Sequence, residues 1–137
     1  MDKSKQPGIE FKNIILIEDN FKRDPDVPNK SKINVDFETT SNIGEEFANV
    51  EITTQLRLLH EDKEVLKHNC KFVGIFLVKK EDENMNIEDF VRNNAPALML
   101  PYIREHITSI SSKAGIKPII LPPINLIALI DNLKEQK

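Results

Sequence analysis

The fold is decided by the stretch Asn94-Ala95-Pro96-Ala97-Leu98-Met99-Leu100-Pro101-Tyr102-Ile103-Arg104-Glu105-His106-Ile107, which continues through Gly115 to Leu133. Asn94 is a favourable N-cap, and proline is tolerated in a first helical turn because the N–H groups there lack partners. Apolar side chains then recur at helical spacing, in the series Met99, Ile103, Ile107, Ile110 and Ala114. This pattern predicts a long amphipathic helix with one apolar stripe, stopped by Gly115 at C′.

The segment after this helix is unusually apolar for a surface loop. It carries Ile116, Ile119, Ile120, Leu121 and Ile124 and is stiffened by Pro118, Pro122 and Pro123. A second helix is expected from Asn125, with apolar side chains nearly all round at Leu126, Ile127, Leu129, Ile130 and Leu133. Two interpretations stay open: these side chains complete a core or an oligomer interface, or they line an exposed groove.

Four strands are expected before the long helix, at residues 9–17, 33–39, 50–58 and 65–78. Strict alternation would place Ile9, Phe11, Ile15 and Ile17 on one face of the first strand. Residues 18–32 hold two prolines among charges and are expected to form a crossover loop, with Phe21 and Val27 as its large apolar side chains. A short helical turn is expected at 87–93. Strands followed by helices indicate an α+β fold with an antiparallel sheet, in one domain spanning residues 1–137.

Composition narrows the classes of partner. The chain has 137 residues, 39% of them hydrophobic, and a net charge of −3, which argues against a nucleic-acid partner. No apolar run approaches the roughly 20 residues that a membrane span needs, so no membrane insertion is expected. The N-terminus lacks the apolar core of a signal peptide, and the one cysteine suits a reducing compartment. We therefore expect a cytoplasmic protein.

The motifs of enzymes and cofactor sites are missing from the sequence. The four glycines are scattered, so neither a P-loop nor a dinucleotide fingerprint exists, and we expect no enzyme activity, catalytic residue or cofactor. His68 and Cys70 alternate onto one strand face and could supply two zinc ligands, but no CxxC or HxxxH partner accompanies them. We interpret them as a small buried thiol beside a partly buried imidazole, with no metal site. Glu18-Asp19 is interpreted as a pair of loop charges.

A combination of residues near the C-terminus resembles the signature of the SecB family of export chaperones. It comprises Pro96, Leu98, Pro101-Tyr102, Arg104-Glu105, Ile107-Thr108, Ser112, Pro123, Asn125 and Ala128-Leu129. The similarity runs without gaps from about residue 96 to residue 129, and a weaker similarity extends back to the strand near Ile9.

This resemblance implies a four-stranded antiparallel sheet with a long helix and a shorter C-terminal helix, assembled as a homotetramer (a dimer of dimers). It also implies an ATP-independent holdase that binds unfolded preprotein clients in apolar grooves before export. Carried over by position, the groove residues are Phe21, Val27, Leu98, Tyr102, Ile119, Leu121 and Leu129. Leu126, Ile130 and Leu133 occupy neighbouring positions that remain apolar.

Two departures from the family bear on the handover partner, the translocation ATPase SecA. Where the family carries acidic contact residues on the sheet, this chain has Asn13, Ile17 and Asn69, and it ends at Lys137 without an extended tail. The residues of this chain therefore match the family's SecA-contact residues poorly. A SecB-like chaperone of a toxin–antitoxin system, or a more general holdase, is one alternative. An α+β domain that binds a lipid or another small hydrophobic ligand is the other.

Overall fold

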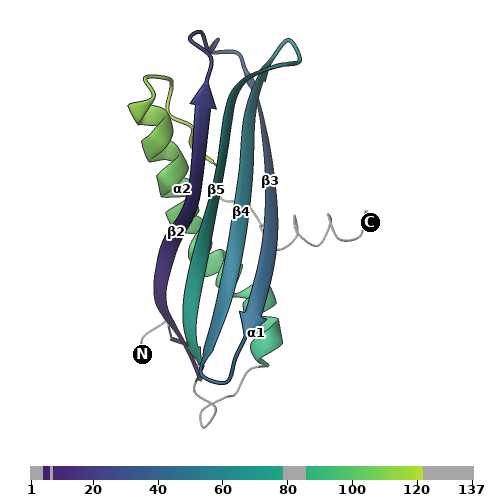
Figure 1. The fold of residues 1–137 in the computed structure, drawn as a ribbon, viewed down its shortest axis with the longest axis vertical. Helices are drawn as coiled ribbons and strands as arrows, with labels where there is room; N and C mark the ends of the chain where they lie inside the picture. Colours follow the sequence, from purple (N-terminus) through teal and green to yellow (C-terminus); the bar gives the residue numbers. More distant parts are fainter. Residues whose placement is uncertain (1–4, 7, 79–85, 122–137) are drawn as a thin grey trace.

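Five β-strands and two helices make up the part of the chain that the structure, a computed structural model, describes: residues 5–6, 8–78 and 86–121 (Figure 1). The strands are β1 Lys5–Gln6, β2 Ile9–Arg23, β3 Lys32–Ile43, β4 Phe47–His60 and β5 Lys63–Val78. The helices are α1 Ile87–Asn93 and α2 Ala95–Lys113. The sheet has the order β1-β2-β5-β4-β3, and every neighbouring pair is antiparallel. The predicted fold of four long antiparallel strands and a long helix is confirmed, and the two-residue β1 is an addition.

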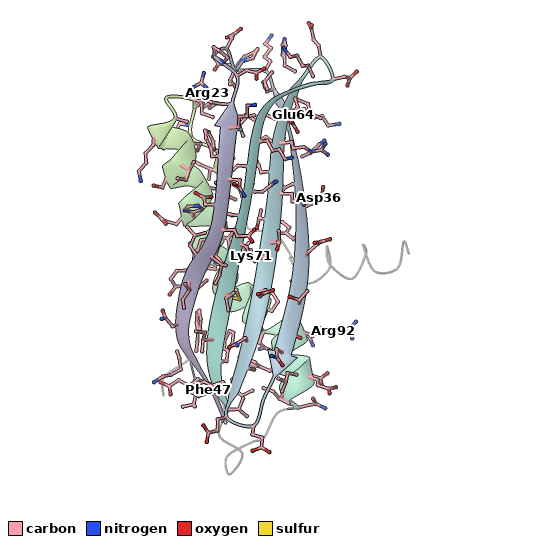
Figure 2. The ribbon with its side chains drawn as sticks, viewed as in Figure 1. Arg23, Asp36, Phe47, Glu64, Lys71 and Arg92 are labelled. Atoms are coloured by element: carbon pink, nitrogen blue, oxygen red, sulfur yellow. The ribbon has the colours of Figure 1, made fainter. Side chains whose placement is uncertain are left out.

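The sheet buries one face under α2, which runs diagonally across the strands in Figure 1. On β4 and β5 every second side chain is buried, as expected for strands covered on one side. The helix contributes the predicted stripe, in which Met99, Ile103 and Ile107 are all at most 1% exposed. This stripe therefore packs against the chain's own sheet. Figure 2 shows Arg23 and Glu64 at one end of the sheet and Phe47 at the other.

The side chain of Met99 on α2 lies directly against Gly74 on β5. A Cβ atom at this position would lie 2.7 Å from Met99 Sδ, closer than real Cβ atoms come to a neighbour. Glycine is therefore required here by space, because any side chain would push Met99 away from the strand. At the other end of α2, Gly115 has φ +74°, which confirms the predicted C′ stop.

Two β-bulges in β2 overturn the predicted faces of this strand. Pairing with β5 shifts between Phe11 and Asn13 and again between Leu16 and Glu18, so Lys12 and Ile17 are extra residues without a direct partner. Each bulge changes the alternation by one. Leu16 therefore pairs with Phe72 and shares its face, whereas Ile15 and Ile17 leave the face on which they were expected. Ile15 and Ile17 are 41% and 54% exposed.

The second strand is also longer than predicted, because it continues to Arg23. Phe21 therefore lies in β2 rather than in the crossover loop, which shrinks to residues 24–31. The Arg23 side chain fixes this junction: its guanidinium donates to the carbonyls of Asp24 (2.9 Å), Pro25 (2.9 Å) and Ala114 (2.6 Å). The last of these is a carbonyl at the end of α2, so β2, the crossover loop and the helix end are held together.

The predicted helical turn at 87–93 is confirmed as α1. Its N-cap is Asn86, whose Oδ1 accepts from the backbone N–H of Glu88 at 2.8 Å. Neither α1 nor α2 is long and apolar enough to cross a membrane. The second helix expected from Asn125 lies outside the described residues.

Candidate functional site

After α2 the chain folds back along the helix as an extended segment, residues 116–121, here called the return segment. Side chains of α2 hold its backbone. Thr108 Oγ1 donates to the carbonyl of Ile119 (2.7 Å), and Ser111 Oγ accepts from the N–H of Ile119 (2.8 Å). Arg104 Nε donates to the carbonyl of Leu121 (2.9 Å). Ser111 is a polar residue outside the apolar stripe, yet it is buried because its hydroxyl accepts from the buried backbone N–H of Ile119.

Two hollows flank the return segment. The first has a volume of about 340 Å³ and lies between the crossover loop, β3, β4 and the return segment. Its apolar lining is Val27, Ile33, Leu58, Ile116, Ile119 and Ile120. The second, about 380 Å³, lies along α2 between Pro101, Arg104, Thr108 and the end of the return segment. Ile120 lines both hollows and is 71% exposed, although its neighbours Ile119 and Leu121 are 6% and 3% exposed. The alternation makes Ile120 a ridge between two apolar depressions.

The predicted groove residues that the structure describes do not all lie at one site. Val27 and Ile119 line the first hollow, and Leu121 lines the second. Phe21, Leu98 and Tyr102 line neither of these two hollows. Phe21 and Leu98 are half-buried against the core, and Tyr102 is 49% exposed with its ring set edge-on to Phe11. The predicted residues Leu126, Leu129, Ile130 and Leu133 lie outside the described residues.

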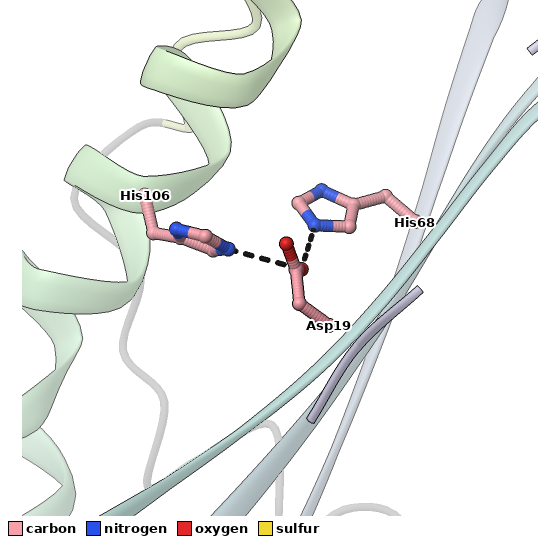
Figure 3. A network of polar contacts seen from close by, with 3 residues as sticks. All are labelled: Asp19, His68 and His106. Atoms are coloured by element: carbon pink, nitrogen blue, oxygen red, sulfur yellow. Dashed lines mark hydrogen bonds and ion pairs between the residues drawn. The ribbon is translucent and has the colours of Figure 1, made fainter. Parts of the chain in front are cut away.

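A separate polar cluster lies beneath α2 (Figure 3). His68 Nε2 and His106 Nε2 lie 2.6 Å and 3.0 Å from the same atom, Asp19 Oδ1. Cys70 completes the group: one potential ligand atom from each of these four side chains lies within 4.8 Å of the others. His68 and Cys70 are each 2% exposed. No CxxC or HxxxH motif accompanies His68 and Cys70, and it is the fold that brings Asp19 and His106 beside them.

The ionisation of this cluster follows from its surroundings. Burial opposes ionisation of Asp19, but hydrogen bonds and positive charge from His106 and His68 outweigh it and hold the pKa of this carboxyl below 3.8. Burial, reinforced by the charge of Asp19, raises the pKa of the Cys70 thiol to about 12. The Thr54 hydroxyl lowers the pKa of Cys70 slightly, yet its oxygen is buried without a hydrogen-bond partner of good geometry.

The sequence could not reveal the cluster because its members meet through tertiary structure. Asp19 pairs with Cys70, and the second bulge, at Ile17, reverses the change of face caused by the first, so Asp19 shares the buried face with Ile9. It was expected to be a loop charge because the loop was expected to begin at residue 18. His106 directly precedes Ile107 of the apolar stripe, and this position was the one available signal that it flanks the buried side of the helix.

Comparison with known proteins identifies relatives of this chain. A family model described as preprotein translocase subunit SecB matches residues 17–137. The protein-export protein SecB of Aromatoleum aromaticum is 30% identical over 115 residues, covering 76% of this chain and 72% of that protein. The SecB of Magnetococcus marinus is 27% identical over 109 residues, covering 79% and 68%. An uncharacterised protein of Methanocaldococcus jannaschii is 29% identical over 143 residues, covering 100% and 92%.

A solved structure shares the fold. The SecB-like chaperone Rv1957 of Mycobacterium tuberculosis, in complex with a ChAD peptide from the Rv1956 HigA1 antitoxin, superposes with a TM-score of 0.73. The superposition covers 85% of this chain and 90% of that one at 18% identity. The resemblance found in the sequence around Pro96 to Leu129 is thus confirmed by a match that spans most of the chain. The protein belongs to the SecB family.

Proposed function

We propose that this protein is an ATP-independent holdase chaperone that binds apolar segments of unfolded polypeptides beside the return segment. The observation that carries the proposal is Ile120, a large apolar side chain left 71% exposed between two apolar hollows. An extended client segment could place alternate side chains in the two depressions, one on each side of this ridge. Folded proteins bury their apolar stretches, so unfolded chains are selected without nucleotide.

Energetics favours many weak sites over one strong site. Burial of one Leu or Ile side chain contributes about 1.5–3 kcal/mol. Fixing one flexible client residue costs about 1–2 kcal/mol. A single short segment therefore gains little, and useful affinity requires several grooves within reach of the same client. This supports the proposal of a homotetramer, built as a dimer of dimers, and light scattering coupled to gel filtration tests it; a monomer at micromolar concentration would contradict it.

The holdase proposal is tested by aggregation of several chemically unfolded proteins, with and without ATP. The wild type is expected to suppress aggregation equally in both conditions, because its sequence has no nucleotide-binding motif. Ile120→Asp is expected to weaken this suppression at least about tenfold, since a charge on the ridge must be desolvated by every bound client. Protection that requires ATP, or no protection against any client, would refute the proposal.

A matched control separates the hollows from general surface hydrophobicity. Ile17→Asp makes the same chemical change at an isoleucine that is 54% exposed on β2 and lines neither hollow. It is expected to suppress aggregation like the wild type. If both variants lost aggregation suppression equally, the return segment would not be the client-binding site. Saturable one-to-one binding of a fatty acid, without any holdase activity, would favour the alternative of a small-ligand protein.

We propose protein export as the pathway, with unfolded preproteins as clients, which implies a cytoplasmic location before translocation. The descriptions of the family and of its curated relatives support this role, and a toxin–antitoxin role is the alternative. SecA binding is expected to be weaker than client binding, because Asn13, Ile17 and Asn69 supply no charge for a basic partner surface. Calorimetric titration with SecA of the same organism tests this; tight, salt-insensitive binding would contradict it.

A further inference from the structure

The polar cluster is assembled by three separate elements of the fold. Asp19 comes from β2, His68 and Cys70 from β5, and His106 from α2. Because Asp19 pairs directly with Cys70, and Phe21 with His68, three members share the face of the sheet that α2 covers. His106 reaches this face from above (Figure 3). The cluster thus lies where the helix and the sheet meet.

The donor set has the chemistry of a particular class of metal ion. One thiol sulfur, two imidazole nitrogens and one carboxylate oxygen are the ligands that zinc uses in tetrahedral sites, whereas Mg²⁺ and Ca²⁺ require oxygen. Zinc–ligand bonds of about 2.0–2.3 Å place tetrahedral ligand atoms roughly 3.3–3.7 Å apart. In the cluster, the potential ligand atoms are from 2.6 Å to at most 4.8 Å apart, so the observed distances extend both below and above this tetrahedral range. Each separation therefore differs from the tetrahedral value by little more than about 1 Å, a change of the size that side-chain rotations produce.

The hydrogen bonds among these side chains do not account for every buried polar atom in and beside the cluster. Asp19 Oδ1 satisfies one nitrogen of each imidazole, but the Cys70 thiol gains no strong partner from this arrangement. The hydroxyl of Thr54, which is 1% exposed and directly opposite Cys70 on β4, faces the thiol but makes no hydrogen bond of good geometry. Buried polar atoms without partners are uncommon and often mark a missing ion or water. The side chains of His106 and Asp19 are 16% and 26% exposed, which leaves a route to solvent.

We propose that Asp19, His68, Cys70 and His106 bind one Zn²⁺ ion, which fixes α2 to strands β2 and β5. The ion binds one nitrogen of each imidazole, which carries its proton on the other ring nitrogen, and it binds the Cys70 sulfur as a thiolate after the thiol proton is released to solvent. The role is structural because all four positions are filled by protein side chains, and no position remains for a substrate. This site is independent of client binding, since none of its members lines either hollow.

The test uses chelator-treated full-length protein and Zn²⁺ alone, with affinity measured by competition against a chromophoric chelator. The wild type is expected to bind one Zn²⁺ per chain. Cys70→Ser and His106→Gln should each weaken binding by more than about 100-fold, because even the loss of an outer partner of a metal ligand costs about 10–100-fold. The control is His60→Gln, which changes a histidine outside the cluster and should bind like the wild type.

Co²⁺ provides a readout that does not depend on variants. Bound Co²⁺ is expected to show the strong visible absorption of a tetrahedral site together with a near-ultraviolet thiolate-to-cobalt band. Zinc should also raise the midpoint of thermal unfolding of the wild type and of His60→Gln. Four outcomes would each overturn the proposal: no stoichiometric zinc, equal affinity in Cys70→Ser and the wild type, a cobalt complex without the thiolate band, or equal binding of Mg²⁺.

Discussion

The first hollow and the polar cluster lie on the same face of the same sheet, yet one is open and apolar while the other is closed and polar. The hollow is bordered by two irregular segments, the crossover loop and the return segment, and it leaves Ile120 in solvent. The cluster is bordered by regular elements, and α2 covers it. The contrast teaches that segments outside the regular elements create the open space in which we propose that a polypeptide binds. Fixed strand and helix positions create the precise spacing that an ion requires.

The largest expected effect comes from a change that both regions share. Ile107, 1% exposed beneath α2, supports the helix from which the cluster and the return segment are both positioned. Ile107→Ala should lower the free energy of unfolding by about 2–5 kcal/mol. It should also weaken zinc and client binding together. Urea denaturation measures the first effect, and Ile17→Ala is the control, with less than about 0.5 kcal/mol expected at an exposed site.

A smaller change should affect the hollow and spare the cluster. Ser111→Ala removes the acceptor of the buried Ile119 N–H, which should cost about 1–3 kcal/mol and loosen the return segment. Ser112 is the matched control: both serines donate to the Thr108 carbonyl, but only Ser111 also accepts from Ile119. Client binding should therefore fall in Ser111→Ala and stay constant in Ser112→Ala. Parallel losses in both variants would show that the hydrogen bond to Ile119 is unimportant.

A change of pH should affect the cluster and spare the hollow. The folded pKa of Asp19 lies below its ordinary value of 3.8, so its contribution to stability is complete above that value and is lost as the pH falls through the folded pKa. In metal-free protein, Asp19→Asn should therefore flatten the loss of stability that occurs as the pH falls below 3.8. Denaturation curves at each pH measure this, with Glu18→Gln as the control. An unchanged acid limb in Asp19→Asn would contradict the assignment.

The smallest expected effect on stability belongs to Ile120. Because its side chain is 71% exposed, Ile120→Asp should change the free energy of unfolding by less than about 0.5 kcal/mol, although it weakens client binding. Thermal unfolding of the isolated protein measures this. A large destabilisation would mean that Ile120 packs in the folded protein and that the ridge is part of the core.

The sequence was informative where a pattern is local and failed where distant residues meet. The stripe at Met99, Ile103 and Ile107 predicted α2 because helical periodicity and burial coincide within a single element. The predicted faces of β2 were wrong from Ile15 onward, because strict alternation was assumed and the sequence pattern did not reveal the bulge. Val27 lies in the crossover loop, as expected, and lines the first hollow. The cluster was missed because its spacing along the chain, from Asp19 to His106, shows nothing of its 2.6 Å and 3.0 Å contacts.

The two bulges of β2 bear on how the length of this strand can change during evolution. Lys12 and Ile17 have no direct partner, so deleting either one would leave every other residue of β2 opposite its present neighbour and on its present face. Deleting a paired residue such as Asn20 would instead move Asp19 and the residues before it by one position along β5. Length differences among relatives should therefore accumulate at positions 12 and 17. The evenly paired ladder of β3 and β4 should keep a constant length.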